Sequence, residues 1–367
     1  MNRVRVLVVE DSVTVRKRIV EVLSADAQVE VVAEAEDGKT AIELCMRLRP
    51  DVLTLDMMMP VMSGLAATEY IMAYCPTPIV IVSSSTNRGE LFRTYEALAA
   101  GAVDVLEKPA GDDSDVNWEA RLIATVKLVS RIRVITHLRG RLGESGRDQG
   151  RPVHPGCDAA AGSAPAGRRA AWPEVVAIGA STGGPGAIVE LVRALPRGFS
   201  FPILLVLHLG RLFAGAFADW LGSQCAFPVA YARDGDALPA RGAPRVLLAP
   251  PDRHLVVRSG RLRLIDEPER HSCRPSVDVL FESIARELGP RAAACLLTGM
   301  GRDGAEGLLA IRQAGGCTFA QDEESSVVFG MPREAIALGA AERVLSPAQM
   351  ARALSQLDRM AASGDAP

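Results

Sequence analysis

Short apolar runs alternate with amphipathic segments over the first 110 residues of the chain. We expect the apolar runs to be strands, and they lie at 4–9, 29–33, 51–55, 78–82 and 102–106. The segments between them have the 3.6-residue spacing of helices with one apolar face. Repeated β-α units of this size predict a doubly wound parallel sheet. A last helix is expected from about Trp118 to Leu138.

The texture changes at residues 139–172, which are rich in Gly, Ala, Pro and Arg and have no apolar period. Such a composition cannot bury enough apolar surface to fold, so it predicts a flexible linker. We therefore expect one domain at 1–138 and a second at 173–362.

The second domain resumes the alternation of strands and helices. Strands are expected at 175–180, 203–208, 245–250, 293–299 and 316–321. Residues 254–265 form two alternating runs around Ser259-Gly260, a pattern typical of a β-hairpin. The prediction is a second doubly wound, Rossmann-like α/β domain, whose sheet gains an antiparallel portion from the hairpin.

Composition narrows the class of protein. The chain has 367 residues, 48% of them hydrophobic, and a formal net charge of −3. A small negative net charge does not favour binding to nucleic acid. The seven cysteines include no C-x-x-C pair, which favours reduced thiols that serve packing. No stretch offers about 20 clean apolar residues for a membrane span, and the first residues do not resemble a signal peptide. We expect a cytoplasmic protein.

Polar residues follow the predicted strands of the first domain: Glu10 and Asp11, then Asp56, Ser83 and Lys108. Ligands bind outside the carboxyl ends of parallel strands, and acids meeting there repel unless a cation such as Mg²⁺ joins them. A carboxylate beside Mg²⁺ and a lysine can attack a phosphoryl group. The alternative, that each acid is a solvated strand end, does not account for all five residues together.

GASTGG at 179–184 follows the first strand of the second domain and contains the G-x-S-x-G spacing of a nucleophile elbow. A dinucleotide loop needs G-x-G-x-x-G, and Ser181 stands where its second glycine would be. Gly184-Pro185-Gly186 lacks the third glycine, and no Walker lysine follows. The serine is therefore better explained as a nucleophile than as part of a nucleotide loop.

A serine nucleophile needs an imidazole base and an orienting acid. Only His208 among the five histidines ends a predicted parallel strand, and that strand follows the serine's own. Asp303 lies in a glycine-rich turn that opens a helix, where it could instead be an N-cap. The backbone N–H groups of such a turn can hold an oxyanion. The chain order Ser, His, Asp differs from that of α/β-hydrolases.

The first domain resembles the response-regulator receiver domain over about residues 3–130. The matching motifs are Glu10, Asp11, Asp56-x-x-x-Pro60, Ser83 and Lys108-Pro109. The resemblance implies a flavodoxin-like fold and phosphorylation of Asp56 by a histidine kinase. It implies phosphoryl contacts from Ser83 and Lys108, and Mg²⁺ held by Asp11, Asp56 and the Met58 carbonyl, with Glu10 assisting. Val105 stands where the family often has an aromatic switch residue.

The second domain resembles the catalytic domain of the chemotaxis protein-glutamate methylesterases, the CheB family. The likeness rests on GASTGG, His208, LTGMGRDGA at 297–305 and AQDEESSVVFGMPREAI at 320–336. It implies that Ser181 attacks a glutamyl methyl ester of a chemoreceptor, with His208 as base and Asp303 orienting it. It also implies an oxyanion contact from the Met300 N–H, a site lined by Thr182 and no cofactor for the hydrolase.

The resemblance further implies receptor-glutamine deamidation and a receiver that covers the active site until it is phosphorylated. We expect a monomer that works beside membrane receptor arrays without insertion. The family's H-M-P-x-x-F is here His208-Leu209-Gly210-Arg211-Leu212-Phe213, a departure in a loop that can shape the substrate cleft. Two alternatives stay open: the same hydrolase in a non-flagellar sensory pathway, and a phospho-dependent binding regulator with a degenerate hydrolase domain.

Overall fold

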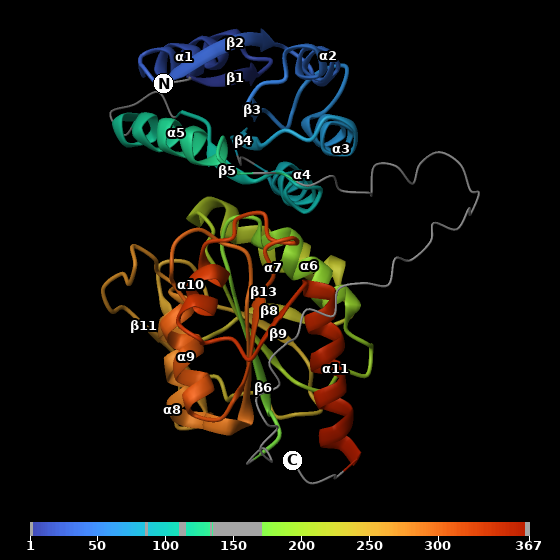
Figure 1. Cartoon of the computed structure of the whole chain (residues 1–367), viewed down its shortest axis with the longest axis vertical. Helices are drawn as coiled ribbons and strands as arrows, with labels where there is room; N and C mark the ends of the chain where they lie inside the picture. The colour runs from blue at the N-terminus through green and yellow to red at the C-terminus, as the bar shows by residue number, and fades with distance from the viewer. Residues whose placement is uncertain (1–2, 85–86, 110–114, 133, 135–170, 364–367) are drawn as a thin grey trace, which may run out of the picture.

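The computed structural model describes residues 3–84, 87–109, 115–132, 134 and 171–363. Two α/β domains lie one above the other in Figure 1, with the N-terminal domain at the top. The predicted linker at 139–172 lies outside the described residues except for its last two. The two doubly wound domains expected from the sequence are confirmed.

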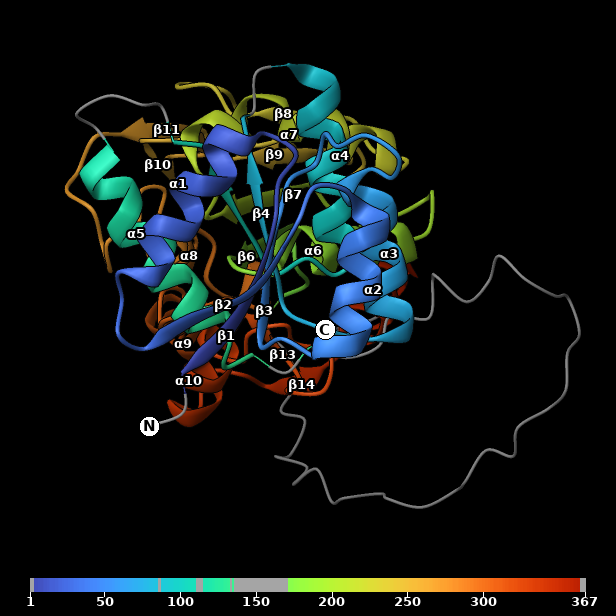
Figure 2. The ribbon, with the colours of Figure 1, turned by 90° about the horizontal axis from the view of Figure 1, so that it is seen from above.

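The first domain is a five-stranded parallel sheet in the order β2-β1-β3-β4-β5, the order of flavodoxin-like folds. Figure 2 looks down on this domain, with α2 and α3 on one side of the strands and α1 and α5 on the other. Its elements are β1 (Val4–Val9), α1 (Val13–Ser24), β2 (Val29–Ala35), α2 (Gly38–Leu48), β3 (Val52–Leu55), α3 (Gly64–Tyr74), β4 (Ile79–Ser83), α4 (Arg88–Ala99), β5 (Asp104–Glu107) and α5 (Asp115–Val129).

The end of the first domain differs from the prediction. Helix α5 runs over Asp115–Val129 rather than Trp118–Leu138. After Val126, the N–H groups of Arg131 and Ile132 bond to carbonyls three residues back, which tightens the last turn and ends the helix. Residues 135–138 of the predicted helix lie outside the described residues.

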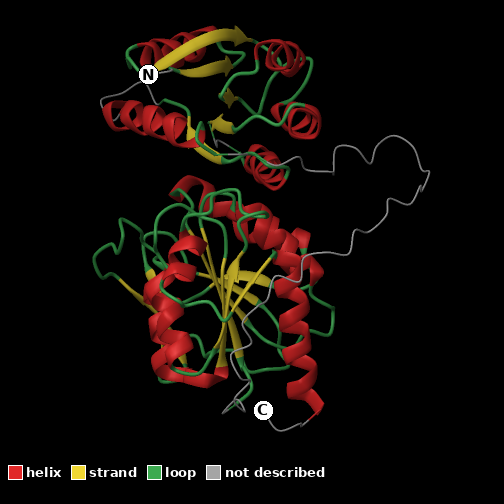
Figure 3. Cartoon of the chain, viewed as in Figure 1, coloured by secondary structure: helices red, strands yellow, loops and turns green. Residues whose placement is uncertain are grey.

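The second domain is a seven-stranded parallel sheet in the order β14-β13-β12-β6-β7-β9-β8, and Figure 3 shows helices on both of its sides. Its elements are β6 (Val175–Ala180), α6 (Gly184–Ala194), β7 (Ile203–Leu207), α7 (Arg211–Gln224), β8 (Val229–Tyr231), β9 (Val246–Leu248), β10 (His254–Arg258), β11 (Arg261–Ile265), α8 (Val277–Leu288), a 3₁₀ turn (Gly289–Arg291), β12 (Ala292–Leu296), α9 (Ala305–Gln313), β13 (Cys317–Gln321), α10 (Met331–Ala337), β14 (Arg343–Leu345) and α11 (Pro347–Ser363).

The expectation that the hairpin extends the main sheet is wrong. Strands β10 and β11 form a separate two-stranded sheet. The hairpin packs on α8 instead, where the Ser283 hydroxyl accepts a hydrogen bond from the Val257 N–H at 3.0 Å. Leu255 of β10 and Leu262 of β11 are fully buried. Burial of this apolar face against a helix gives the hairpin the support that an isolated pair of strands lacks.

The central strand β6 is buried at every residue, as expected for a parallel strand covered on both faces. Helix α8 approaches it so closely that a Cβ on Gly179 would lie 2.2 Å from Cγ1 of Val277. Over the residues that the structure describes, every helix is too short or too polar to cross a membrane.

The two domains share one continuous apolar core, because α4 of the first packs against α6 and α7 of the second. The Tyr95 ring lies 5.4 Å from Phe217 and 5.3 Å from Trp220 between centroids. Its hydroxyl donates a hydrogen bond to the Phe213 carbonyl. At the rim, Arg88 forms an ion pair with Asp219 at 2.8 Å.

Candidate active site and phosphorylation site

Strand register brings Ser181 and His208 to the same edge of the second sheet. Ala180 pairs with Leu207, and the His208 N–H donates to the Ala180 carbonyl at 3.0 Å. Each residue thus comes directly after a paired position on neighbouring strands, which lie about 4.8 Å apart. The Ser181 N–H donates to the Thr298 carbonyl at 3.0 Å, so the serine sits between β7 and β12.

A tight turn carries the chain from Ser181 into α6. The Gly184 N–H donates to the Ser181 carbonyl at 2.7 Å, and Gly183 has φ 77°, a conformation that favours glycine. A Cβ on Gly183 would also lie 2.5 Å from Val327. The glycines beside the serine therefore serve the turn and the close packing around it.

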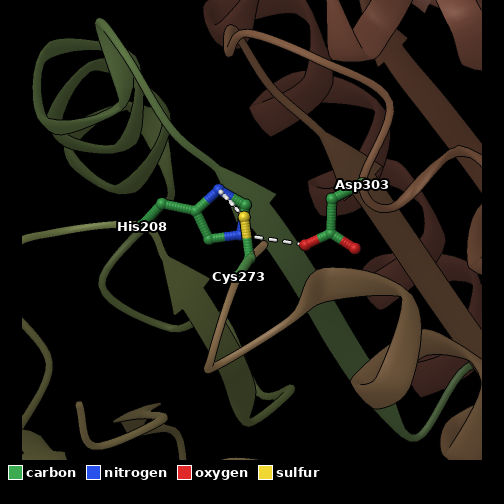
Figure 4. A group of neighbouring side chains, drawn as sticks. All are labelled: His208, Cys273 and Asp303. Carbon is green, nitrogen blue, oxygen red and sulfur yellow. Dashed lines mark hydrogen bonds and ion pairs between the residues drawn. The ribbon is translucent and has the colours of Figure 1, made fainter. Parts of the chain in front are cut away.

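His208 and Asp303 are joined by a hydrogen bond of 2.9 Å between Nε2 and Oδ2 (Figure 4). The Asp303 carboxylate is buried and accepts three further bonds, from the Ser276 hydroxyl at 2.7 Å, the Val277 N–H at 2.7 Å and the Asp278 N–H at 3.1 Å. Asp303 therefore satisfies N–H groups at the start of α8, not of the helix α9 that follows it in sequence.

The ion pair shifts the pKa values of His208 and Asp303 in the directions that favour their charged forms. Burial lowers the pKa of His208, but the bond to Asp303 and the contact with Cys273 outweigh it and raise the pKa to about 9. Burial opposes ionisation of Asp303, yet the bonds from His208, Ser276 and Val277 hold its pKa below the usual value. Asp303 is thus an anion that can orient and stabilise an imidazolium.

The other ring nitrogen of His208 faces a cysteine. Nδ1 lies 3.6 Å from Sγ of Cys273, and Figure 4 shows the thiol and Asp303 contacting different nitrogens of the same ring. Among the described residues, no hydrogen bond joins the Ser181 hydroxyl to His208. Sequence reasoning assigned the cysteines to packing and missed Cys273, because no spacing links it to the serine or the histidine.

The turn after β12 is open to a cavity. Met300 is 51% exposed, and within the described part of the chain its N–H has no hydrogen-bond acceptor. A cavity of about 950 Å³ extends from Met300–Arg302 to Leu128 and Ile132 at the end of α5. The first domain therefore borders the same cavity as Met300, the candidate oxyanion donor. Thr182 lies beside this turn, because its carbonyl accepts from the Thr298 hydroxyl at 3.0 Å.

In the first domain, Lys108 joins two buried carboxylates. Its Nζ lies 2.9 Å from Oε1 of Glu10 and 2.9 Å from Oδ2 of Asp56. Burial, then the charge of Asp56, raise the pKa of Glu10 to about 7, and burial raises the pKa of Asp56. Asp11 is exposed and brings a carboxylate oxygen within 4.8 Å of the other two acids. Met58, two residues beyond Asp56, accepts from Arg93 at its sulfur.

Ser83 accepts a hydrogen bond from the Lys108 N–H at its backbone carbonyl, at 3.0 Å, but in the described part of the chain its side chain bonds to neither Asp56 nor the Lys108 ammonium. Its hydroxyl donates to Oε1 of Glu90 at 2.5 Å, and the Ser84 N–H donates to the same oxygen at 3.0 Å. Glu90 lies in the first turn of α4 and is buried. This carboxylate was not predicted, since an acid in a helical segment carries no signal in the sequence that its side chain points inward.

Two family models match separate parts of the chain. The family model described as response regulator receiver domain matches residues 6–116, and the model CheB methylesterase matches residues 176–354. The fold and site are thus those of a response regulator with a CheB-type output domain. Two relatives named protein-glutamate methylesterase/protein-glutamine glutaminase are similar over nearly the whole chain. The one from Anaeromyxobacter dehalogenans is 44% identical over 97% of each chain, and the one from Nitrosospira multiformis is 43% identical over 96% of this chain and 97% of its own.

Among solved structures, the CheB methylesterase catalytic domain of Thermotoga maritima is 33% identical, with a TM-score of 0.47, and covers 50% of this chain and 98% of its own. The chain belongs to the CheB family, which confirms the resemblance found in the sequence.

Proposed function

We propose that this protein is a phosphorylation-activated serine hydrolase that removes methyl groups from glutamyl γ-methyl esters of chemoreceptors and deamidates receptor glutamines. The observation that supports it best is the buried Asp303–His208 pair at 2.9 Å, at the sheet edge that also carries Ser181. The relatives named methylesterase/glutaminase supply the substrate class.

In this mechanism Nε2 of His208 keeps its proton toward Asp303, so Nδ1 is the nitrogen that accepts the proton of Ser181. The serine oxygen attacks the γ-carbonyl, and the Met300 N–H donates to the oxyanion. His208 then protonates the departing methanol, or ammonia from a glutamine, and an acyl-serine remains. Water, activated by the same imidazole, releases the glutamate. Thr182 lines the substrate side of this site.

The first domain has a donor set that fits Mg²⁺. Within the residues that the structure describes, Oε2 of Glu10 and Oδ1 of Asp56 are buried oxygens without a hydrogen-bond partner. Asp11 adds an exposed carboxylate, in keeping with oxygen coordination of a hard cation. The Met58 carbonyl completes the proposed set. Bound Mg²⁺ would neutralise phosphoryl charge. Asp56 attacks the phosphoryl group of a chemotaxis histidine kinase, the bond from phosphorus to the kinase histidine breaks, and Lys108 pairs with the new charge.

We infer a relay that does not need an aromatic residue at Val105. A phosphoryl group on Asp56 attracts the Ser83 hydroxyl, which at present donates to Glu90. Loss of that hydrogen bond changes the position of α4. The same helix carries Tyr95, whose ring packs against Phe217 and Trp220 of α7. Phosphorylation thereby weakens the docked arrangement and opens the cavity at Met300 to a receptor helix, by a shift between two populations.

The function is tested by methanol release from methylated chemoreceptor membranes, with and without a small phosphodonor and Mg²⁺. Wild type should release methanol faster with the phosphodonor, and an Asp56→Asn variant should show only the basal rate. A folded wild-type protein that releases no methanol under either condition would overturn the methylesterase. Equal stimulation of the Asp56→Asn variant would overturn the switch alone.

A Tyr95→Ala variant should raise the basal rate without a phosphodonor. Loss of two aromatic pairs removes about 1 to 3 kcal/mol from the docked state, which corresponds to a shift of about 5- to 150-fold toward the open one. The matched control is Tyr74→Ala, because Tyr74 on α3 is 49% exposed and contacts Tyr70. Equal basal rates in the two variants would contradict a role of the α4–α7 contact in inhibition.

A further inference from the structure

The contact between Cys273 and His208 has the dimensions of two ligands on one metal ion. Sγ and Nδ1 are 3.6 Å apart. Zinc bonds of about 2.3 Å to sulfur and about 2.05 Å to nitrogen place the two ligand atoms about 3.6 Å apart at a tetrahedral angle. The separation of the two atoms therefore matches that of two ligands on one tetrahedral zinc ion.

Asp303 prepares the histidine for such an ion. Its Oδ2 lies 2.9 Å from Nε2 of His208, so in the neutral ring the proton sits on Nε2 and the lone pair on Nδ1, toward the thiol (Figure 4). A metal-bound histidine almost always donates its other N–H to a carboxylate or carbonyl, which fixes the tautomer and makes the ligand nitrogen more basic. Asp303 already occupies that outer position.

The cysteine is held by a strained and well-anchored turn. The Cys273 N–H donates to the Arg270 carbonyl at 2.9 Å and the Arg270 N–H to the Cys273 carbonyl at 3.2 Å. Between them His271 and Ser272 have φ 53° and 60°, values that cost energy in residues with a Cβ. His271 is fixed in turn by Asp278 at 3.1 Å and Arg302 at 3.2 Å. The thiol is thus preorganised beside the ring.

We propose that Cys273 and His208 form a binding site for zinc or a similar thiophilic divalent ion, and that its occupancy switches the hydrolase off. The ion displaces the thiol proton and the Nδ1 proton of the imidazolium to solvent, bonds to the thiolate Sγ and to the freed lone pair of Nδ1, and keeps two positions for water. While Nδ1 is bound to metal it cannot accept the proton of Ser181. The binding site goes beyond the proposed function, since metal binding needs no receptor substrate, whereas the switch rests on the proposed role of His208.

The direct test uses Co²⁺ as a spectroscopic probe of the full-length protein, with excess Mg²⁺ present to fill the first domain. Wild type should develop thiolate-to-cobalt charge-transfer absorption and the visible bands of tetrahedral Co²⁺, both reversed by Zn²⁺. Cys273→Ala should lose the charge-transfer band, whereas the matched control Cys225→Ser, at the end of α7, should keep it. A wild-type spectrum without this band, or a band that survives in Cys273→Ala, would overturn the site.

The functional test is zinc inhibition of methanol release, with each variant compared with its own metal-free rate. The concentration of Zn²⁺ for half-inhibition should rise by at least about tenfold in Cys273→Ala and stay at the wild-type value in Cys225→Ser. Inhibition that is equal in all three proteins would overturn the switch. A failed esterase assignment would leave the cobalt spectrum intact, so the two failures are distinguishable.

Discussion

A Ser181→Ala variant should lose methanol release by about 10⁴- to 10⁶-fold, the loss seen when a hydrolase triad loses its nucleophile. The substitution removes one oxygen and keeps the Ser181 Cβ, from which a Cβ on Gly299 would lie only 2.8 Å away. The fold should therefore be unchanged. Methanol release under phosphodonor and Mg²⁺ measures the loss, and an unaltered melting temperature and phosphorylation of Asp56 show that the rest of the molecule is intact.

Ser223→Ala is the matched control for this loss. Ser223 lies on α7, where its hydroxyl donates to the Trp220 carbonyl at 2.6 Å, and its removal should leave the rate within about twofold of wild type, as is usual for a surface substitution. If Ser181→Ala retained methanol release within tenfold of wild type, Ser181 would not be the nucleophile. The thiol of Cys273, 3.6 Å from the same imidazole, would then be the group to test next.

An Asp303→Asn variant should lower kcat by about 10⁴-fold. The amide of asparagine can donate to Nε2 of His208, which would move the ring proton to Nδ1, the nitrogen that must accept from Ser181. The variant should also be less stable by about 1 to 3 kcal/mol, since the carboxylate accepts bonds from Ser276, Val277 and Asp278 at the start of α8. Rates per folded molecule, with unfolding followed separately, measure the two effects.

The pH profile distinguishes a positioning role from a merely structural one. His208 acts as a base only when unprotonated, so the wild-type rate should rise with pH through the His208 pKa of about 9. Without the Asp303 carboxylate that pKa falls, and the residual activity should reach its plateau at lower pH. Asp278→Asn, at a buried acid that bonds to His271, is the control: it should reduce stability with less change in the profile. An unshifted profile in Asp303→Asn would contradict the assigned role.

Much of the candidate site could be predicted because its residues follow parallel strands. Ser181, His208 and Asp303 each come after a run of apolar residues, and the carboxyl ends of such strands meet at one edge whatever the order of strands in the sheet. The same reasoning located Asp56 and Lys108. The strand pattern alone thus identifies the residues at one edge of the sheet, and their chemistry then indicates which of them are candidates for the site.

The remaining features depend on contacts that no local pattern encodes. Cys273 reaches His208 from a turn fixed by bonds to Asp278 and Arg302, which are distant in sequence from the histidine. The Glu90 side chain on α4 points inward, where it accepts hydrogen bonds from Ser83 and Ser84. The hairpin lies outside the main sheet because its apolar face is buried against α8 instead. The apolar positions of α4 look like the inner face of any helix, so the sequence does not show that Tyr95 packs on a second domain.

Under the proposed switch, the attachment of Tyr95 to α7 determines which kinetic constant the first domain changes. Only Leu209 and Gly210 separate His208 from the start of α7 at Arg211, and the Tyr95 hydroxyl holds the carbonyl of Phe213 in the first turn of that helix. Because this connection is short, a movement of α7 would change the orientation of the His208 imidazole. Separation of the two domains would change the orientation of the His208 ring as well as the access of the receptor to the site. Phosphorylation should therefore change the turnover number even at a saturating concentration of receptor.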